Sequence, residues 1–488
     1  MAILTGTNGH DNSDLGGADL FGTDQSDFIY GYDGDDYING RRGADSIFGG
    51  RGHNTIFGGE GDDYVHTEGL TGRYDGGNGV DTIDLSALGQ RAYVSLAQGL
   101  GNFGAMNLTS ATAFVMANFE NVSTGAGDDV ILGSAAANRI SAGAGADRVW
   151  AGGGADLVYG GQGDDVIRGE AGADELHGNE GQDTLRAGAG DDVLLGGTGN
   201  DLLDGGAGFD AASYATHNAA VNVDMLAGTA WSRVGTVNET DTLVDIERVV
   251  GSAFGDQVVA GATTTVDGAA GDDWVWSGSG ANRLVGGAGA DSLSYGYSTS
   301  GVRVSLATGA ASGGFAQGDS ITGFERLYGS THADVLTGDA RDNQLYGNWG
   351  DDTLQGGGGR DLLAGGAGAD ALQGGSGADT FQFAAGDSPV SGPDRILDFQ
   401  RGLDRIDLAG VDANQHASGW QDFSKVTTYA APGSHPGFTA GTVNVRHVQG
   451  DTLVEINTSD NATNGHDAPE MLIRLDGIHA LTSADFLF

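Results

Sequence analysis

Residues 160–168 read Gly-Gly-Gln-Gly-Asp-Asp-Val-Ile-Arg, and residues 169–177 read Gly-Glu-Ala-Gly-Ala-Asp-Glu-Leu-His. Both stretches have glycine at the first and fourth places, aspartate at the sixth and a large aliphatic residue at the eighth. The same nine-residue unit fills the whole of Thr124–Ser213 in one unbroken register. A fixed short period predicts stacked coils rather than a globule.

Each place in the unit has a physical task. Glycine allows backbone turns that a β-carbon would block. Aspartate adds a hard, charged oxygen, which suits Ca²⁺. The last three residues predict a short strand, so the eighth side chain, such as Ile167 or Leu176, points inward while its neighbours face out.

This repeat resembles the RTX family of calcium-binding nonapeptide repeats. The resemblance implies a calcium-bound parallel β-roll with two units per coil, in which each ion lies between units two apart, as between Asp147 and Asp165. We therefore expect an all-β protein built from calcium-bound parallel β-roll (β-solenoid) arrays, with three β-rich inserts and a C-terminal β-sandwich-like cap. The cofactor expected is Ca²⁺ at multiple sites. The expected ligands are the sixth-place aspartates Asp27, Asp36, Asp45, Asp63, Asp129, Asp147, Asp156, Asp165, Asp174, Asp183, Asp192, Asp201, Asp210, Asp273, Asp291, Asp334, Asp352, Asp361, Asp370 and Asp379.

The period also predicts how the chain is divided. Inserts interrupt the arrays, and each insert has an alternating strand and ends at a glutamate, as at Glu120, Glu247 and Glu325. All five prolines follow residue 383, and proline weakens sheet ladders, so a separate C-terminal segment is expected. The predicted segments are a degenerate repeat (1–21), array 1 (22–66), insert 1 (67–123), array 2 (124–213), insert 2 (214–250), array 3 (251–294), insert 3 (295–328), array 4 (329–382) and the cap (383–488).

Composition narrows the class of protein. The formal charge is −45 over 488 residues, with 91 glycines and no cysteine, which would normally indicate disorder. The strict period instead indicates a fold that needs its counter-ion. Nothing in so acidic a chain neutralises phosphates, so nucleic acid is not an expected partner. No apolar run approaches the roughly 20 residues of a membrane span.

The C-terminal segment resembles that of serralysin-type proteins, and its end, Asp485-Phe486-Leu487-Phe488, is similar to the tail of type I secretion substrates. The resemblance implies a secreted protein, extracellular or on the cell surface, with the type I apparatus as a partner. No charged-then-apolar leader opens the sequence.

The sequence lacks the common motifs of catalysis. The sequence has no His-Glu-x-x-His, no Gly-x-Ser-x-Gly and no Pro-His-Asp run of the kind expected of alginate epimerases. We therefore expect no enzyme, and a structural, surface-layer, matrix or adhesive role. The alternative is an enzyme or effector acting on extracellular polysaccharide through a site in the inserts.

Aromatic residues recur at the ninth place. Coils of two units would put Tyr30 above Phe48, and Trp150 above Arg168. Such side chains can stack on sugar rings or on a neighbouring copy, so cell-surface polysaccharide and self-association are the expected partners. The alternative is that they cover strand edges beneath the inserts.

Overall fold

The computed structural model describes residues 2–12, 17–69, 71–103, 113–235, 237–411, 425–429, 442–458 and 469–488. The chain forms two compact units, one of Met1–Val221 with Ala227–Val250 and one of Asn222–Leu226 with Gly251–Phe488. In the described residues the helical elements are two short 3₁₀ turns, η2 (Gly314–Ala316) and η3 (Ser483–Asp485), and the other elements are strands. The expected all-β class is confirmed.

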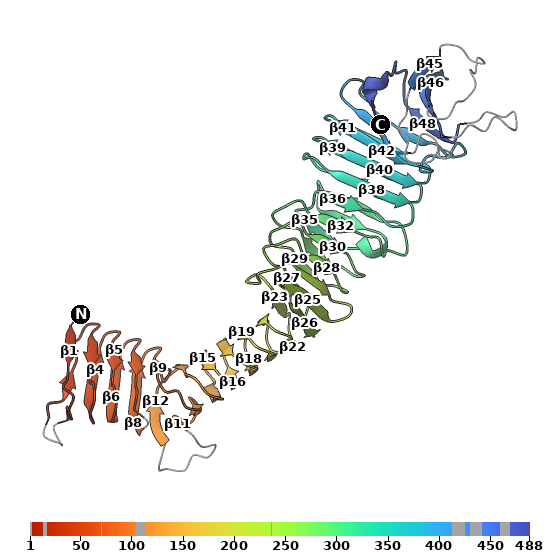
Figure 1. The fold of residues 1–488 in the computed structure, drawn as a ribbon. Helices are drawn as coiled ribbons and strands as arrows, with labels where there is room; N and C mark the ends of the chain where they lie inside the picture. The colour runs from red at the N-terminus through yellow and green to blue at the C-terminus, as the bar shows by residue number, and fades with distance from the viewer. Residues whose placement is uncertain are drawn as a thin grey trace. The chain divides into compact units, whose positions relative to one another are not determined.

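In the arrays of the first unit, successive strands alternate between two sheets, seen as stacked rungs in Figure 1. One sheet contains β1 (Ile3–Thr5), β3 (Phe28–Tyr30), β5 (Ser46–Phe48), β7 (Tyr64–His66), β9 (Thr82–Asp84), β13 (Asn121–Ser123), β15 (Arg139–Ala144), β17 (Leu157–Gln162), β19 (Glu175–Glu180), β21 (Val193–Thr198), β23 (Ala211–Ser213) and β27 (Arg248–Val250). The other contains β2 (Leu20–Phe21), β4 (Tyr37–Arg42), β6 (His53–Glu60), β8 (Thr71–Asn78), β12 (Ala113–Ala117), β11 (Leu100–Phe103), β10 (Ala92–Ser95), β14 (Val130–Ser134), β16 (Arg148–Gly153), β18 (Val166–Ala171), β20 (Thr184–Ala189), β22 (Leu202–Ala207), β26 (Val237–Val244) and β25 (Thr229–Val234).

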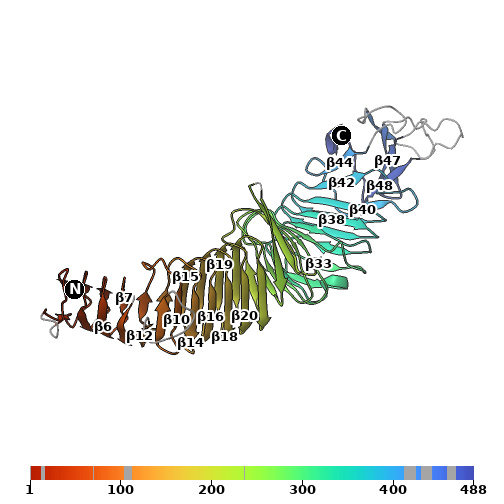
Figure 2. The ribbon, with the colours of Figure 1, turned by 60° about the horizontal axis from the view of Figure 1, so that its bottom comes forward.

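The pairing register confirms two units per coil. Strand β16 pairs in parallel with β18, and Val149 lies opposite Ile167, its counterpart two units later. Strands β17 and β19 pair in the same way on the other sheet. Figure 2 shows β14, β16, β18 and β20 side by side in this order.

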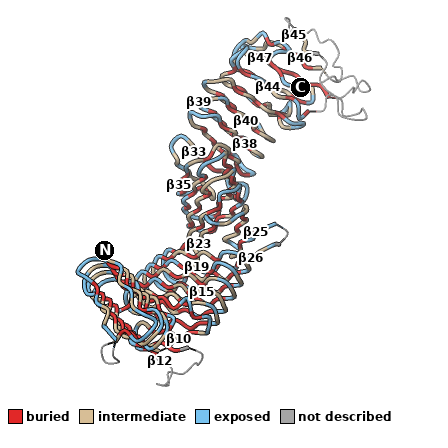
Figure 3. Tube along the Cα trace, turned by 60° about the vertical axis from the view of Figure 1, so that its left-hand side comes forward, coloured by how far each residue is buried: buried red, intermediate tan, exposed pale blue. Residues whose placement is uncertain are grey.

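The core is the ladder of eighth-place side chains between the sheets. Ile167 and Leu176 are fully buried, whereas their strand neighbours are only partly covered or exposed. Buried and more exposed positions therefore alternate along each coil (Figure 3). The sixth-place aspartates are buried too, and Asp165 is only 1% exposed.

The second unit has the same architecture. One of its sheets contains β29 (Thr265–Asp267), β31 (Arg283–Val285), β35 (Ser320–Thr322), β34 (Ala310–Ser312), β33 (Arg303–Ser305), β37 (Val335–Thr337), β39 (Thr353–Gly358), β41 (Ala371–Ser376), β43 (Asp394–Ile396), β48 (Met471–Leu475), β47 (Asp451–Asn457), β46 (Thr442–Val448) and β45 (Lys425–Tyr429). The other contains β24 (Val221–Asp224), β28 (Gln257–Val259), β30 (Trp274–Trp276), β32 (Ser292–Ser294), β36 (Arg326–Tyr328), β38 (Gln344–Trp349), β40 (Leu362–Ala367), β42 (Thr380–Ala384), β44 (Arg405–Gly410) and β49 (Phe486–Leu487).

The inserts continue the sheets rather than interrupting them. In each insert, the alternating strand (β10, β24 or β33) pairs in parallel with a strand of the next array. A later strand of the insert (β12, β26 or β35) pairs in parallel with the preceding array. This shared topology agrees with the similarity of the three inserts in sequence.

The predicted end of the first array is wrong, and one unit of the third array is a residue shorter than the others. The first array does not stop at His66, because β8 and β9 add two more units, with Tyr74 and then Ile83 as the buried eighth-place residues. In the shortened unit that starts at Ala260, Val266 is the buried residue. Thr264, two residues before it, therefore occupies the sixth place, and its N–H donates to Oδ1 of Asn282.

The cap extends both sheets. Strands β43 and β48 pair beside β41, whereas β44 and β49 pair beside β42. The last described strand, β49, contains Phe486, which is 4% exposed, and Asp485 caps the preceding 3₁₀ turn. Asp485 and Phe486 are thus part of the folded cap.

Candidate metal centre

The sixth-place residues form hydrogen-bonded ladders along the turns. The backbone N–H of Asp147 donates to Oδ1 of Asp165 over 2.8 Å, and the N–H of Asp165 donates to Oδ1 of Asp183 over 2.8 Å. On the other side, Asp156 donates to Asp174 in the same way. The pairing of units two apart expected from the resemblance is present in the structure.

The second carboxylate oxygen has no such partner. Oδ2 of Asp165 is buried, and no donor among the described residues reaches it. The same is true of every predicted ligand except Asp27 and Asp334, namely Asp36, Asp45, Asp63, Asp129, Asp147, Asp156, Asp174, Asp183, Asp192, Asp201, Asp210, Asp273, Asp291, Asp352, Asp361, Asp370 and Asp379. An unpaired buried carboxylate oxygen is costly, so its regular recurrence calls for a positive partner.

Backbone carbonyls converge on the same space. A β-carbon built on Gly160 would lie 2.2 Å from Oδ2 of Asp165 and 2.9 Å from the carbonyl oxygen of Gly178. Glycine at the first place therefore keeps open a space bordered by acceptors alone. Hard oxygens of this kind are what Ca²⁺ prefers. Among the described residues no three acidic or histidine side chains cluster together, so single aspartates with backbone carbonyls would hold the ions.

Where asparagine occupies the sixth place, its amide nitrogen takes the position of the aspartate Oδ2, and its hydrogen bond shows which group faces that position. Nδ2 of Asn54 donates to the carbonyl oxygen of Gly49, the first residue of its own unit, over 2.9 Å. Nδ2 of Asn282 donates to Gly278 over 3.2 Å. An aspartate oxygen in this position faces a carbonyl with no proton between them, and a cation resolves the repulsion.

The electrostatics agree with this interpretation. Burial first, and then the neighbouring carboxylate of Asp147, raises the pKa of Asp165 to about 7, despite the opposing backbone hydrogen bond. Burial likewise raises the pKa of Asp352 to about 8. The metal-free ladder is thus poorly ionised near neutrality, and a bound cation would hold it in its charged form.

Asp27 and Asp334 belong to a different kind of turn. Oδ2 of Asp27 accepts the backbone N–H of Thr23 at 2.6 Å and its hydroxyl at 2.7 Å, and Oδ2 of Asp334 accepts the N–H of Ser330 at 2.6 Å. Burial tends to raise the pKa of Asp27, but the hydrogen bonds from Ala2 and Thr23 lower it overall. Oδ2 of each of these two carboxylates already accepts hydrogen bonds, so a bound cation would stabilise them less.

We call these closed turns. They have glycine at the first place followed by Ser, Thr or Asp at the second, where most of the other turns have a second glycine. Four further closed turns contain the pairs Thr7–Asp11, Ser134–Asn138, Ser252–Asp256 and Asp339–Asn343. The pattern is visible in the sequence as Gly followed by Ser, Thr or Asp, but the sequence interpretation did not separate it from the glycine-pair turns.

Two carboxylates were missed as candidate ligands. Asp81 and Asp394 are fully buried, and each has an unpaired Oδ2. Burial raises their pKa values to about 6 and about 8. Residues 76–84, Gly-Gly-Asn-Gly-Val-Asp-Thr-Ile-Asp, match the repeat in full, so Asp81 was recognisable. Asp394 accepts the N–H of Asp370, which lies 24 residues before it, whereas ladder partners within the arrays, such as Asp147 and Asp165, are 18 residues apart.

The insert glutamates continue the ladders. Oε2 of Glu120, Glu247 and Glu325 accepts the N–H of the preceding sixth-place residue, Asp81, Asp210 or Asp291 respectively, over 2.8 to 3.0 Å. The glutamate that ends each insert therefore stands where the next repeat aspartate would be.

Ladders of buried, unpaired carboxylates at glycine turns define a cation-binding parallel β-roll. The family model described as the RTX calcium-binding nonapeptide repeat (4 copies) matches residues 5–47, 40–69, 123–158, 150–185, 177–211, 260–293, 328–363 and 355–388, slightly more than half of the chain. The chain belongs to this family. Repeats of the family bind calcium ions at multiple sites, so calcium is the cofactor, as expected from the sequence.

Solved structures give further similarities. A subunit of the mannuronan C5-epimerase from Azotobacter vinelandii is 32% identical over 32% of this chain and 78% of its own, with a TM-score of 0.23. The extracellular lipase LipA from Serratia marcescens is 16% identical over 68% of this chain and 40% of its own, with a TM-score of 0.21. Among curated proteins no match was found.

The family match ends at residue 388, so the serralysin-like character of the C-terminal segment stays a prediction. RTX repeat proteins are typically secreted, which agrees with the expected class. In the part of the chain that the structure describes, no helix is long and apolar enough to cross a membrane.

Proposed function

We propose that this chain is an extracellular or cell-surface protein that folds when calcium fills its turns and serves as a structural or adhesive element. The observation that supports the proposal most is the repeated Oδ2 atom that is buried and has no donor, as at Asp165. A carboxylate row of this kind disfavours folding without cations, and extracellular modules bind calcium with dissociation constants of roughly 10⁻⁴–10⁻³ M.

The decisive experiment is a calcium titration of the full chain, followed by circular dichroism and light scattering. We expect little β-structure in excess chelator and cooperative ordering at roughly 10⁻⁴–10⁻³ M Ca²⁺. Mg²⁺ is the control, because its smaller, strictly octahedral shell suits backbone carbonyl turns less well. A complete β-sheet spectrum in chelator would refute calcium-driven folding.

The non-enzymatic role is part of the same proposal. It predicts that calcium-loaded protein assembles or coats cells, and that it leaves neutral and acidic polysaccharides intact. Depolymerisation or epimerisation of any of these polymers would instead favour the alternative of a polysaccharide-acting enzyme.

A further inference from the structure

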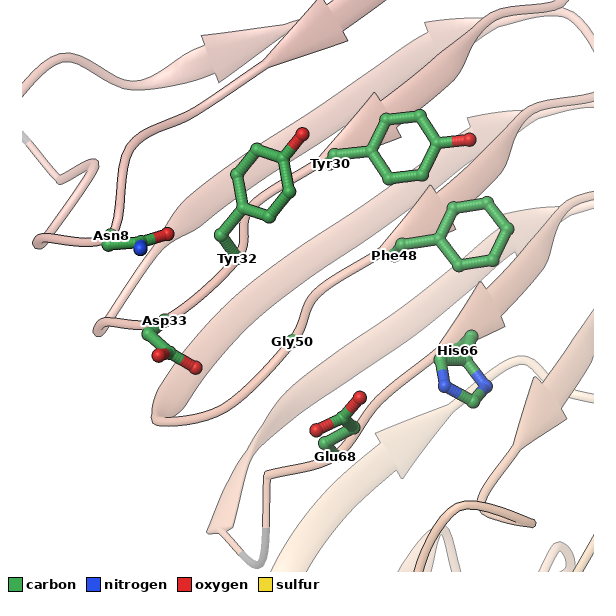
Figure 4. A pocket seen from close by; sticks show the side chains of 8 residues that line it. All are labelled: Asn8, Tyr30, Tyr32, Asp33, Phe48, Gly50, His66 and Glu68. Atoms are coloured by element: carbon green, nitrogen blue, oxygen red, sulfur yellow. The ribbon is translucent and has the colours of Figure 1, made fainter.

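A groove lies across the outer face of the first array, on the sheet that contains β3, β5 and β7. Its volume is about 320 Å³, which is at the lower end of small-ligand sites. The residues that line it are Asn8, Tyr30, Tyr32, Asp33, Phe48, Gly50, His66 and Glu68. Figure 4 shows the aromatic rings between Asn8 and Asp33 at one end and Glu68 and His66 at the other.

The floor of the groove is an aromatic ladder built by the repeat register. Tyr30, Phe48 and His66 occupy ninth places on successive coils, and the parallel pairing puts each opposite the next. The Tyr30 and Phe48 rings are nearly parallel at 8°, with centroids 4.9 Å apart. This spacing exceeds a face-to-face contact, so the rings are offset and part of each face stays open.

The ends of the ladder extend and orient this surface. Tyr32, which is 45% exposed, stacks beside Tyr30 at 6.2 Å. At the other end the His66 ring lies 5.9 Å from Phe48, and its Nδ1 is held by the Asp84 carboxylate at 2.8 Å. The imidazole is therefore fixed in orientation, and the aromatic surface is preorganised before any ligand arrives.

Polar groups surround the aromatic floor. The Asp33 and Glu68 side chains are exposed, and Glu68 is paired with Arg51 at 3.1 Å. An aromatic floor with a rim of acceptors and donors matches a sugar ring, which has an apolar C–H face and a periphery of hydroxyl groups. The Asp33 and Glu68 carboxylates at the rim repel anionic ligands.

We infer that this aromatic groove binds an uncharged saccharide, which stacks on Tyr30 and Phe48 and hydrogen-bonds to the rim. This inference deepens the proposed adhesive role by naming the class of ligand, and it rests on that role. The rim carboxylates disfavour uronic acid, sulfated and phosphorylated glycans.

The test uses the full calcium-loaded chain and a panel of neutral hexose and N-acetylhexosamine oligosaccharides, with oligomannuronate and choline as charged probes. We expect calorimetric binding of at least one neutral oligosaccharide, no binding of oligomannuronate, and at least tenfold weaker binding in Tyr30→Ala. The matched control is Tyr159→Ala, because Tyr159 is also a ninth-place residue stacked on a histidine, His177 at 4.5 Å, but does not line the groove.

The calcium midpoint of each variant, read by circular dichroism, separates loss of the groove from loss of the fold. Failure of every neutral oligosaccharide to bind, equal losses in Tyr30→Ala and Tyr159→Ala, or preference for choline over sugars would each overturn the inference. If the chain folds with calcium but binds no sugar, only this inference fails. If it folds fully in chelator, the proposed calcium-driven function fails instead.

Discussion

Replacing Asp165 by asparagine is expected to have opposite effects on stability with and without calcium. The amide oxygen can still accept the N–H of Asp147, as Oδ1 does now. The amide nitrogen takes the place of Oδ2 and can donate to a first-place carbonyl, as Asn54 does to Gly49. The variant therefore supplies its own donor where the wild type needs a cation.

The magnitudes follow from the burial of this carboxyl. Its pKa of about 7, against an ordinary value of 3.8, corresponds to about 4 kcal/mol for ionising it in the metal-free fold at pH 8. Partial hydration and salt reduce this to about 2 kcal/mol, which the variant recovers. In the wild type, a site filled at a hundredfold over its dissociation constant adds about 2.7 kcal/mol and at a thousandfold about 4.1 kcal/mol. The wild type and the variant should then be equally stable when free calcium is at roughly thirtyfold over the dissociation constant of the site.

Hydrogen exchange of the β18 and β20 amides, followed by mass spectrometry across a calcium series, reports the local free energies of opening. Asp164→Asn is the matched control. Asp164 is the neighbouring residue, is exposed and uses Oδ1 to accept the N–H of Gln182. It should change stability by less than about 0.5 kcal/mol in both conditions. A change of the same sign with and without calcium in Asp165→Asn would refute the reasoning, as would equal behaviour of the two variants.

Three further predictions concern protons, backbone strain and closed turns. Between about pH 4 and pH 7 the metal-free folded chain binds more protons than the unfolded chain, because burial raises pKa values such as that of Asp165. Protein in excess chelator should therefore gain β-structure when the pH is lowered from 8 to 5. The calcium concentration at the folding midpoint should rise over the same range, because protons compete with calcium for the carboxylates. A circular dichroism series that shows neither trend contradicts this. Gly154→Ala should destabilise the folded chain by at least about 1–3 kcal/mol, because φ of Gly154 is +105° and a β-carbon there would lie 2.5 Å from the Ala137 nitrogen. Gly153→Ala is the control, because a β-carbon at Gly153 would meet nothing closer than 3.7 Å. Equal calcium midpoints for the two variants would count against this geometry. Ser330→Ala should cost about 1 kcal/mol with or without calcium, since its hydroxyl closes the Asp334 turn, and a cost seen only in calcium would show that this turn holds an ion.

Much of the fold was predictable because the period constrains it. The two-unit coil follows from the resemblance to RTX repeats, the inward eighth place from strand alternation, and the stacking of Tyr30 on Phe48 from the two together, and the structure confirms all three. The cation–π contact of Arg168 over Trp150, at 5.8 Å, follows from the same register. Each of these features depends only on strand alternation and on a constant number of residues per coil.

The errors arose where the sequence keeps the coil but changes the residues. Residues 67–75 have Gly72 at the sixth place and Tyr74 at the eighth, so the unit no longer resembles its neighbours. The structure retains it because the Tyr74 ring is fully buried and its hydroxyl lies 3.0 Å from that of Thr67. The shape of a coil thus survives loss of the aspartate, which a motif based on that aspartate cannot detect.

The C-terminal tail also has a second explanation. The acidic-then-apolar end, read as a secretion signal, has Asp485 accepting the N–H of Thr482 at 2.7 Å and Phe486 paired opposite Ile406. Export by a type I apparatus stays a prediction. Removal of Asp485–Phe488 would disturb the cap as well as any signal, so a secretion defect in such a deletion must be compared with its folding.

The distribution of closed turns indicates where calcium is needed. Arrays 3 and 4 open with closed turns, at Ser252–Asp256 and Ser330–Asp334. In the insert that precedes each of these arrays, a tyrosine hydroxyl satisfies the ladder carboxylate at 3.0 Å, from Tyr214 to Asp241 and from Tyr295 to Asp319. In these two inserts and in the first turn after each, the ladder carboxylates thus accept hydrogen bonds from donors of the chain itself.

The long interiors of the arrays lack such donors, and the unpaired carboxylate oxygens concentrate there, as at Asp165 and Asp174. Because each coil contacts only its neighbours, stability is nearly additive along a solenoid. It follows that calcium controls the array interiors, while inserts 2 and 3 and the first turns after them depend on ordinary hydrogen bonds.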